Sequence, residues 1–342
     1  MENNENTQKK AMFLRILPFF ILGLTLLTIG LSFIGKFYDV AIGEELRTFS
    51  LSNLLTDKSL SSSLKTLYWI TYIVMPLLGS CCVFFYKKNK NFAFISMILF
   101  LVAAIITLVS KDILPEALYQ HIKTVEHVKK PCSIEEVYVW SVLPTILYFI
   151  LSLLVLSFAI EDVKFTTRDI AESGVLIAAA LVLNFIRLFP APTGGSVNLQ
   201  MLPLFILAIR KGPIKAFIGC GVVYGLISCL TDGYGIATYP FDYLLGIGST
   251  AILGLFSKQI LDEEKDNYNL KGEIFIFVGV ALATSVRFMA GTISSMVLYD
   301  YAFGPAALYN VGYVFISASI ALAVIMGLYG PLLKINKQFP NR

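Results

Sequence analysis

The sequence predicts an all-α integral membrane protein with about ten transmembrane helices. Hydrophobic residues make up 56% of the 342 positions and charged residues only 15%, and the mean hydropathy is +0.74. A soluble domain of this length must cover its surface with charge, so it does not need this share of apolar residues. The apolar residues also form runs long enough to cross about 30 Å of hydrocarbon as helices.

We expect ten apolar segments to be the spans. One of them, 197–209, is short for a crossing, and another, 305–333, is long. The first run follows Lys9 and Lys10 but is too long for the apolar part of a signal peptide, and no small-residue cleavage site follows it, so it is expected to remain as an anchor. The ten segments are 11–34, 67–86, 92–109, 137–160, 170–188, 197–209, 214–230, 241–256, 274–298 and 305–333.

The basic residues predict the orientation in the membrane. If the N-terminus lies inside and each segment crosses once, the inner segments hold 17 of the 27 Lys and Arg residues. Cytoplasmic loops of membrane proteins carry an excess of these residues. We therefore expect a multi-pass protein of a bacterial cell membrane, with both termini in the cytoplasm. The net charge of +4 reflects this topology and does not indicate nucleic acid binding.

Several functional classes lack their signatures in this sequence. There is no G-x-x-x-x-G-K-[ST] phosphate loop, no H-E-x-x-H and no G-x-S-x-G motif, and the spans hold few polar groups, so neither an enzyme nor a cofactor is expected. Both histidines, His121 and His127, lie in one predicted outer loop near two glutamates and Cys132, but their spacing matches no strong metal-ligand pattern. We expect solvated loop residues there and no metal site.

The chain is expected to divide near residues 161–169. Residues 1–160 form a four-span N-terminal region of unknown role, and residues 165–335 form a six-span bundle with tight connections. No internal repeat relates the two halves.

The stretch TDGYGIATYPFDYLL in the second half is the most informative part of the sequence. Pro240 is expected to start a helix, with Asp242 and Tyr243 in its first turn. A carboxylate near the membrane boundary is costly unless a positive group meets it, and aromatic faces such as those of Tyr234 and Tyr239 attract organic cations. This pattern predicts contact with a ligand; the alternative is that Asp242 only complements the helix dipole.

Other polar and small residues suggest a pocket and a packing face. The loop RLFPAPTGGS is rich in Pro and Gly, which suits a flexible lid, and Asn198 and Gln200 follow near the outer face. Arg287 lies within a span and is expected to pair with an acid or the backbone, with ligand contact as the alternative. Gly174 and Ala178 are four residues apart, so another helix can approach closely, either within this chain or from another subunit.

Together these residues resemble the thiamine-specific S component of energy-coupling factor (ECF) transporters. The resemblance covers about residues 165–335. It rests on the six-span layout and on GGSVNLQMLPLFILAIRKGP, VVYGL, YPFDYLLGIGSTAILGLF and VRF. It implies a bundle that binds thiamine on its outer side and docks, within the membrane lipid, on a coupling transmembrane subunit and two ATPase subunits. Such partners would supply the phosphate loop that this chain lacks.

The resemblance also implies roles for individual residues. Asp242 and Tyr243 correspond to the acidic–Tyr pair of the family, Tyr299 to a Trp and Tyr309 to a Tyr of the last helix. With Tyr239 and Asn198 they form the candidate ligand-binding set. Gly174 and Ala178 fall on the motif that meets the coupling subunit.

Two positions depart from the family pattern. Gly291 stands where the family has His, and Val314 stands where it has Asn. Compensation is expected from Asn310, one turn from Val314, or from Asn198 or Gln200. The expected cargo is thiamine or a related heterocyclic cation or pyrimidine.

The main expectation is thus a substrate-capturing subunit of an ATP-driven vitamin importer. One alternative is a stand-alone secondary transporter whose pathway the four additional spans complete. Another is a non-transporting membrane receptor or scaffold. Co-purification with ATPase and coupling subunits, uptake without them, or neither uptake nor tight ligand binding would separate the three.

Overall fold

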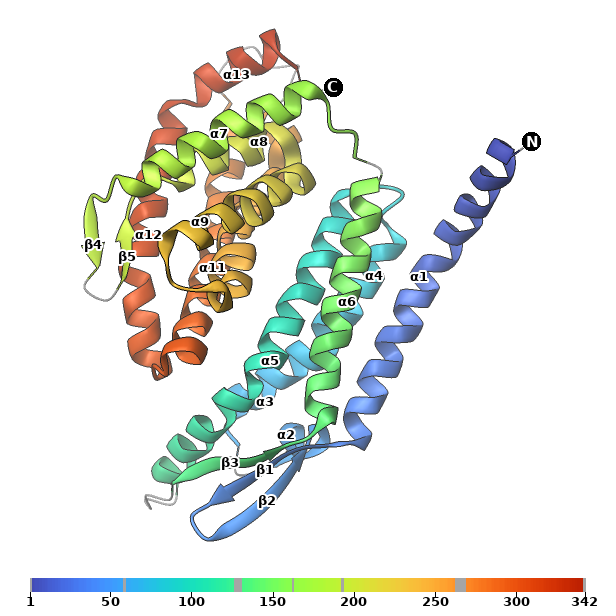
Figure 1. Ribbon diagram of the computed structural model, residues 1–342, viewed down its shortest axis with the longest axis vertical. Coiled ribbons are helices and arrows are strands. Elements are labelled where there is room, and N and C mark those ends of the chain that lie inside the picture. The colour runs from blue at the N-terminus through green and yellow to red at the C-terminus, as the bar shows by residue number, and fades with distance from the viewer. Residues whose placement is uncertain are drawn as a thin grey trace. The chain divides into compact units, whose positions relative to one another are not determined.

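The computed structural model describes residues 2–57, 60–125, 131–161, 163–191, 194–261 and 269–340. The chain divides into two compact units, residues 1–161 and residues 162–342, which Figure 1 shows in blue to green and in green to red. We describe each unit by itself.

Long apolar helices form most of the N-terminal unit (Figure 1). Large side chains such as Phe19 on α1 and Val139 on α6 are 66% and 76% exposed, which suits contact with hydrocarbon rather than water. The helical segments of this unit are α1 (Glu2–Ile34), α2 (Leu51–Thr56), α3 (Ser62–Trp69), the π-helical turn η1 (Ile70–Val74), α4 (Met75–Phe84), α5 (Asn91–Val125) and α6 (Val139–Glu161).

A three-stranded antiparallel sheet closes one end of this unit, in the order β2-β1-β3. It consists of β1 (Lys36–Ile42), β2 (Glu45–Ser50) and β3 (Cys132–Val137), and Gly43, with a φ of 65°, makes the turn between β1 and β2. These segments lie between the expected spans, where loops were predicted. β3 lies some 90 residues beyond β1, so no local pattern predicts their pairing.

The loop expected at 110–136 also differs from the structure. Most of it is helix, because α5 continues to Val125. His121 lies on this extension and Cys132 begins β3, whereas His127 and Glu126 lie outside the described residues. Among the described side chains, no group of three or more His, Cys, Asp or Glu is placed to hold a metal ion.

The C-terminal unit is a helical bundle with one short hairpin (Figure 1). Its elements are α7 (Thr167–Phe185), β4 (Phe189–Ala191), β5 (Gly194–Val197), α8 (Met201–Phe217), η2 (Ile218–Tyr224), α9 (Gly225–Asp232), η3 (Ile236–Thr238), η4 (Tyr239–Ile247), η5 (Gly248–Phe256), α10 (Ser257–Ile260), α11 (Leu270–Tyr299), α12 (Phe303–Gly327) and α13 (Tyr329–Gln338).

Eight helical stretches of the described chain are long and apolar enough to cross a membrane. One of them, Met201–Asp232, is broken at Gly212, where φ is 73° and ψ is 177° just before Pro213, so it contains two of the expected segments. α7 is not in this set because Arg168, Asp169 and Glu172 crowd its first two turns. The two units thus contain the apolar segments predicted from the sequence, and the chain is a multi-pass, all-α membrane protein.

Two expected segments of the C-terminal unit have a different internal structure. The long segment 305–333 is two helices, because α12 ends at Gly327 and α13 follows. Segment 241–256 is π-helical in η4 and 3₁₀-helical in η5 instead of α-helical. There a Cβ on Gly254 would lie 2.6 Å from the Gly212 carbonyl carbon, so the glycines permit a close backbone approach.

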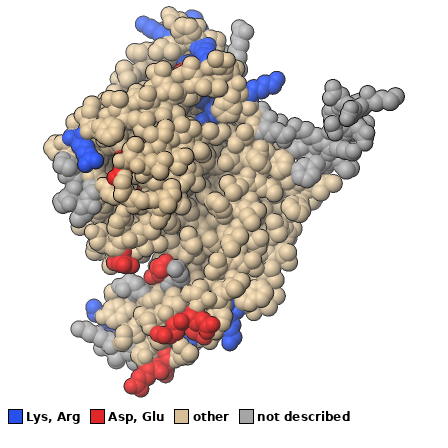
Figure 2. Space-filling view, viewed as in Figure 1, with Lys and Arg blue, Asp and Glu red and all other residues tan. Residues whose placement is uncertain are grey.

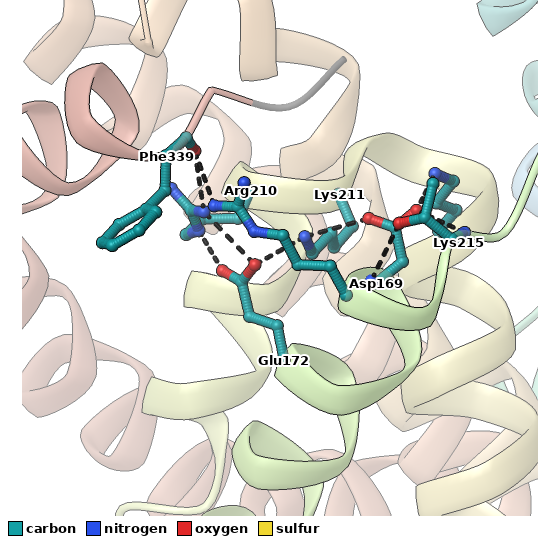
Figure 3. Close-up of polar contacts among 8 residues, drawn as sticks. Asp169, Glu172, Arg210, Lys211, Lys215 and Phe339 are labelled. Atoms are coloured by element: carbon teal, nitrogen blue, oxygen red, sulfur yellow. Dashed lines mark hydrogen bonds and ion pairs between the residues drawn. The ribbon is translucent and has the colours of Figure 1, made fainter.

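A cluster of charged side chains fixes the start of α7 against α8 (Figure 3). Lys215 Nζ lies 2.7 Å from Asp169 Oδ2, and Lys211 Nζ lies 3.0 Å from Asp169 Oδ1 and 2.6 Å from Glu172 Oε2. Arg210 also pairs with Glu172. Lys211 and Arg210 are almost completely buried, at 1% and 3% exposure, so these ion pairs are needed to offset their desolvation.

Charge is scarce over the helical faces in Figure 2, where acidic side chains gather over the sheet end of the N-terminal unit. In the C-terminal unit, Val175 and Leu308 are 70% and 77% exposed. Apolar side chains this exposed are costly in water and favourable in lipid, which fits helices that contact lipid.

Candidate ligand-binding cavity

A polar cavity lies in the C-terminal unit, at the end of α7 away from the charged cluster. α7, β5, α9, η4, α11 and α12 all contribute to its wall. Five of the six residues predicted to bind a ligand line it: Asn198, Asp242, Tyr243, Tyr299 and Tyr309.

The sixth predicted residue, Tyr239, lies outside the cavity wall. Its hydroxyl donates a hydrogen bond to the carbonyl oxygen of Gly221 at 3.2 Å, and its ring packs against the apolar core of the bundle. Tyr239 begins η4, whose hydrogen bonds run from residue i to i+5. Side chains three positions apart on such a helix point in different directions, so Tyr239 and Asp242 do not share a face.

Asp232, at the end of α9, is a carboxylate whose hydrogen bonds are made within the protein. Its Oδ1 accepts from Asn184 Nδ2 at 3.2 Å. Its Oδ2 accepts from Ser228 Oγ at 3.0 Å and from the Tyr243 hydroxyl at 3.1 Å. Asn198 Nδ2 in turn donates to Asn184 Oδ1 at 3.1 Å. This network fixes the positions of the Asn184 amide and the Tyr243 ring.

Asp242, on η4, has fewer partners. Among the described residues a single donor reaches its carboxylate, Ser294 Oγ at 2.7 Å from Oδ2. Arg287 lines the same cavity, and its buried Nη1 has no hydrogen-bond partner among the described atoms. The expected pairing of Arg287 with an acid is not seen as a salt bridge in the described chain, although the guanidinium is near enough to Asp242 to interact with its charge. The cavity holds an acceptor and a donor whose hydrogen bonding is incomplete.

Tyrosine rings form much of the remaining wall. The rings of Tyr309 and Tyr313 on α12 lie 5.4 Å apart, and Tyr299, at the end of α11, is 48% exposed. The predicted lid loop is the β4–β5 hairpin, which contributes Gly195 and Ser196 to the lining. Gly195 has a φ of 44°, and a Cβ there would lie 2.9 Å from the Tyr309 hydroxyl, so glycine permits this close approach.

Comparisons with known proteins found a family that matches the second half of the chain. The family described as Thiamine transporter protein (Thia_YuaJ) matches residues 170–339. The C-terminal half of this chain belongs to the thiamine transporter family. The N-terminal unit lies outside the matched segment.

Two bacterial relatives are named thiamine transporter ThiT. The protein from Bacillus subtilis is 26% identical over 183 residues, which are 48% of this chain and 94% of the relative. The protein from Lacticaseibacillus paracasei is 26% identical over 147 residues, 38% of this chain and 67% of the relative. A solved structure of ThiT from Listeria monocytogenes has 24% identity, covers 50% of this chain and 95% of its own, and gives a TM-score of 0.42.

The two positions that depart from the thiamine transporter family both line the cavity, as does Asn310. Asn310 is 1% exposed. Its Nδ2 donates to Ser295 Oγ at 3.0 Å and to the Ala306 carbonyl at 2.9 Å. Both amide hydrogens are therefore used inside the protein, and Asn310 does not offer a ligand the donor that we expected in compensation.

Several lining residues were not predicted from the sequence. Ser294 and Ser295 are ordinary small residues of a spanning helix, and Asn184 and Asp232 end helices without any recognisable motif. Tyr313 lies four positions after Tyr309 on α12, so the helical repeat from Tyr309 could have indicated that it faces the same side.

Gly174 and Ala178 lie on the exposed face of α7, whereas Ile177 and Ala180 face the core. A Cβ added to Gly174 would meet no atom within 4 Å. The small pair does not pack within the described C-terminal unit.

Proposed function

We propose that this chain captures thiamine, or a closely related heterocyclic cation or pyrimidine, and is the substrate-binding subunit of an ATP-driven importer of the ECF type. The observation that carries the proposal is the cavity that combines Asp242, whose carboxylate has a single donor in the described chain, with tyrosine walls. The thiamine transporters named among its relatives support the choice of cargo.

The chemistry of the cavity suits a cationic heterocycle. A carboxylate in a partly dehydrated site attracts a cation strongly, because a charge-assisted hydrogen bond there is stronger than one between neutral groups. Aromatic faces such as those of Tyr299 and Tyr309 add a cation–π attraction of about 0.5–2 kcal/mol. Asp232 contributes indirectly, since its hydrogen bond to the Tyr243 hydroxyl holds that ring in the wall.

The coupling part of the proposal rests on two features. The chain contains no phosphate loop, so ATP hydrolysis would come from other subunits. Gly174 and Ala178 leave an exposed, shallow surface on α7, where the helix of a coupling subunit can approach closely. In this proposal both termini lie in the cytoplasm, and the cavity opens toward the outside.

The test is to purify the chain in detergent and measure thiamine binding by calorimetry, then to co-express it with the coupling and ATPase subunits of a bacterial ECF importer. Saturable thiamine binding and co-purification support the proposal. Uptake in cells without those subunits would instead make the chain a secondary transporter. Absence of both binding and uptake would leave a receptor or scaffold.

A further inference from the structure

A directional chain of hydrogen bonds runs through the α11–α12 wall of the cavity. The Tyr313 hydroxyl donates to Asn310 Oδ1 at 2.8 Å. Asn310 Nδ2 donates to Ser295 Oγ at 3.0 Å, and Ser295 Oγ donates to the Gly291 carbonyl at 2.9 Å. Each group passes one hydrogen to the next, and the chain ends on a backbone oxygen.

The direction of this chain is fixed by the groups that can only accept. Asn310 Nδ2 also faces the Ala306 carbonyl at 2.9 Å, and a carbonyl oxygen cannot donate. The Asn310 amide therefore cannot flip, its Oδ1 must face Tyr313, and the Tyr313 proton must point to that oxygen. The Tyr313 oxygen therefore faces the cavity with its lone pairs, and no donor of the described chain reaches them.

Gly291 is what makes room for this arrangement. A Cβ at this position would lie 2.5 Å from Asn310 Oδ1, while the Tyr313 hydroxyl would be 3.7 Å away. A Cβ at 291 must therefore displace the Asn310 carboxamide, whereas it leaves Tyr313 in ordinary contact. The orientation of Asn310 therefore depends on the absence of a side chain at position 291.

We propose that Tyr313 is a specificity-determining residue of this cavity. Asn310 binds the Tyr313 proton and Gly291 leaves room for Asn310, so that Tyr313 can act toward a ligand only as a hydrogen-bond acceptor. The Tyr313 hydroxyl oxygen and the Asp242 carboxylate both present hydrogen-bond acceptors to a bound ligand. The ligand group that faces this wall must therefore carry N–H hydrogens. This proposal rests on the proposed function. The feature of the cargo that Tyr313 and Asp242 recognise is an amino group on the heterocycle.

The experiment compares two probes by calorimetry in detergent: thiamine, and the analogue in which the exocyclic amino group of the pyrimidine is replaced by a carbonyl oxygen. The unmodified protein is expected to prefer thiamine by at least about tenfold, because an oxygen there meets acceptors and leaves them without a donor. Tyr313→Phe removes the acceptor, so thiamine binding should weaken about 2- to 12-fold. The ratio of the affinities for thiamine and for the carbonyl analogue should become smaller.

Asn310→Ala tests the direction of the chain. Without Oδ1, the Tyr313 proton is free to point into the cavity, so the carbonyl analogue should gain affinity relative to thiamine. Gly291→Ala should narrow the preference in the same way, and adding it to Asn310→Ala should change nothing further. A role in packing alone would lower both affinities together and leave their ratio unchanged.

Tyr239→Phe is the matched control, because it removes a tyrosine hydroxyl that lies outside the cavity. Melting temperatures without ligand identify any variant that fails to fold; Tyr313→Phe, which loses one hydroxyl, keeps the test open if Asn310→Ala does not fold. Equal affinities of the unmodified protein for the two probes, or an unchanged ratio in Tyr313→Phe, would overturn the inference while leaving thiamine binding intact. If neither probe binds, the proposed function is wrong and this inference falls with it.

Discussion

The two units bury polar side chains in opposite ways. In the N-terminal unit, Ser110 Oγ lies 2.5 Å from the Tyr38 hydroxyl and 3.1 Å from that of Tyr72, and the Tyr148 hydroxyl donates to the Tyr72 carbonyl at 2.8 Å. In the C-terminal unit, Asp242 accepts from one donor, and the N–H group of Arg287 Nη1 has no acceptor, among the described residues. The hydroxyl cluster of the first unit is complete without a ligand, whereas the cavity of the second is not.

This difference distinguishes buried polar side chains that stabilise the fold from those that are available to bind a ligand. Buried polar groups that satisfy one another stabilise a fold, and removing one leaves its partners unsatisfied at a cost of about 1–3 kcal/mol. Polar groups that remain incomplete around a cavity are instead available to a ligand. The same distinction applies to α7, whose buried residues pack in the bundle while its exposed small residues remain available to a partner.

The largest effect is expected at the exposed face of α7. Gly174→Leu combined with Ala178→Leu should abolish co-purification with a coupling subunit, because the added side chains prevent close helix approach. Thiamine affinity, measured by calorimetry, should stay unchanged since neither residue lines the cavity. The matched control is Gly174→Ala with Ala178→Gly, which keeps both residues small and should still assemble. Joint loss of binding and assembly would mean that this face packs within the chain.

The next effect concerns the two carboxylates of the cavity. Asp242→Asn should weaken thiamine binding by about 1–3 kcal/mol, which is roughly 5- to 150-fold, because it removes the charge that meets a cationic ligand. Asp242→Glu restores the charge and should recover most of the affinity. Asp232→Asn should mainly lower the melting temperature of the ligand-free protein, because three protein donors depend on that carboxylate. Unchanged affinity in a folded Asp242→Asn protein would remove Asp242 from the site.

Substitution in the hydroxyl cluster of the N-terminal unit should lower stability without changing thiamine affinity, which is the reverse of the effect expected for Asp242→Asn. Ser110→Ala removes the partner of the Tyr38 and Tyr72 hydroxyls and should cost about 1–3 kcal/mol of stability, measured as a lower melting temperature in detergent. Thiamine affinity should not change. Ser157→Ala is the control, since Ser157 also donates to a helix carbonyl but is exposed. A change in thiamine affinity in Ser110→Ala would show that the cluster acts on the cavity.

The sequence was sufficient to predict the parts of the structure that depend on local pattern. Apolar runs of 17 or more residues specify spanning helices, because every backbone group in lipid must be bonded within its own segment. The break at Gly212 falls between two of the expected segments, whereas the end of α12 at Gly327 was not predicted, since the apolar pattern continues across it. The sheet was not predicted, because β3 pairs with β1 across a long sequence separation and only β1 is mostly buried.

The site was predicted where the resemblance or an unusual residue pointed to it, as at Asp242 and Tyr309. It was not predicted where a residue's role depends on its partner. Asn310 was expected to face a ligand, but its amide hydrogens are bound by Ser295 and Ala306. For the same reason Gly291→His is not a simple restoration of the family residue, since any side chain there meets Asn310 Oδ1 first. Such couplings between helices α11 and α12 appear only once the helices are packed.

The smallest effect is expected at Asp39, in the sheet of the N-terminal unit. Hydrogen bonds from Thr48 Oγ1 at 2.6 Å and the Tyr138 hydroxyl at 2.7 Å hold the pKa of Asp39 below its ordinary value. A group whose pKa is lowered by folding stabilises the fold at neutral pH, and this contribution is lost as the pH falls from about 4 through the lowered pKa. Because these bonds tie Asp39 to β2 and to the residue that follows β3, the sheet should loosen in that range.

Hydrogen exchange of the β1 and β2 amides, compared between the unmodified protein and Asp39→Asn at each pH, measures this contribution. At pH 6 the amides of Asp39→Asn should exchange faster, because the variant lacks the charged acceptor. Toward pH 3 the difference between the two proteins should narrow, as a growing share of the unmodified carboxylate becomes protonated and loses the same interactions. Glu44→Gln removes a charge from the adjacent turn, where no hydrogen bond from the described residues depends on it, and should leave exchange unchanged at both pH values. A difference between Asp39→Asn and the unmodified protein that does not narrow toward pH 3 would mean that the shape of the side chain, and not its ionisation, ties the strands together.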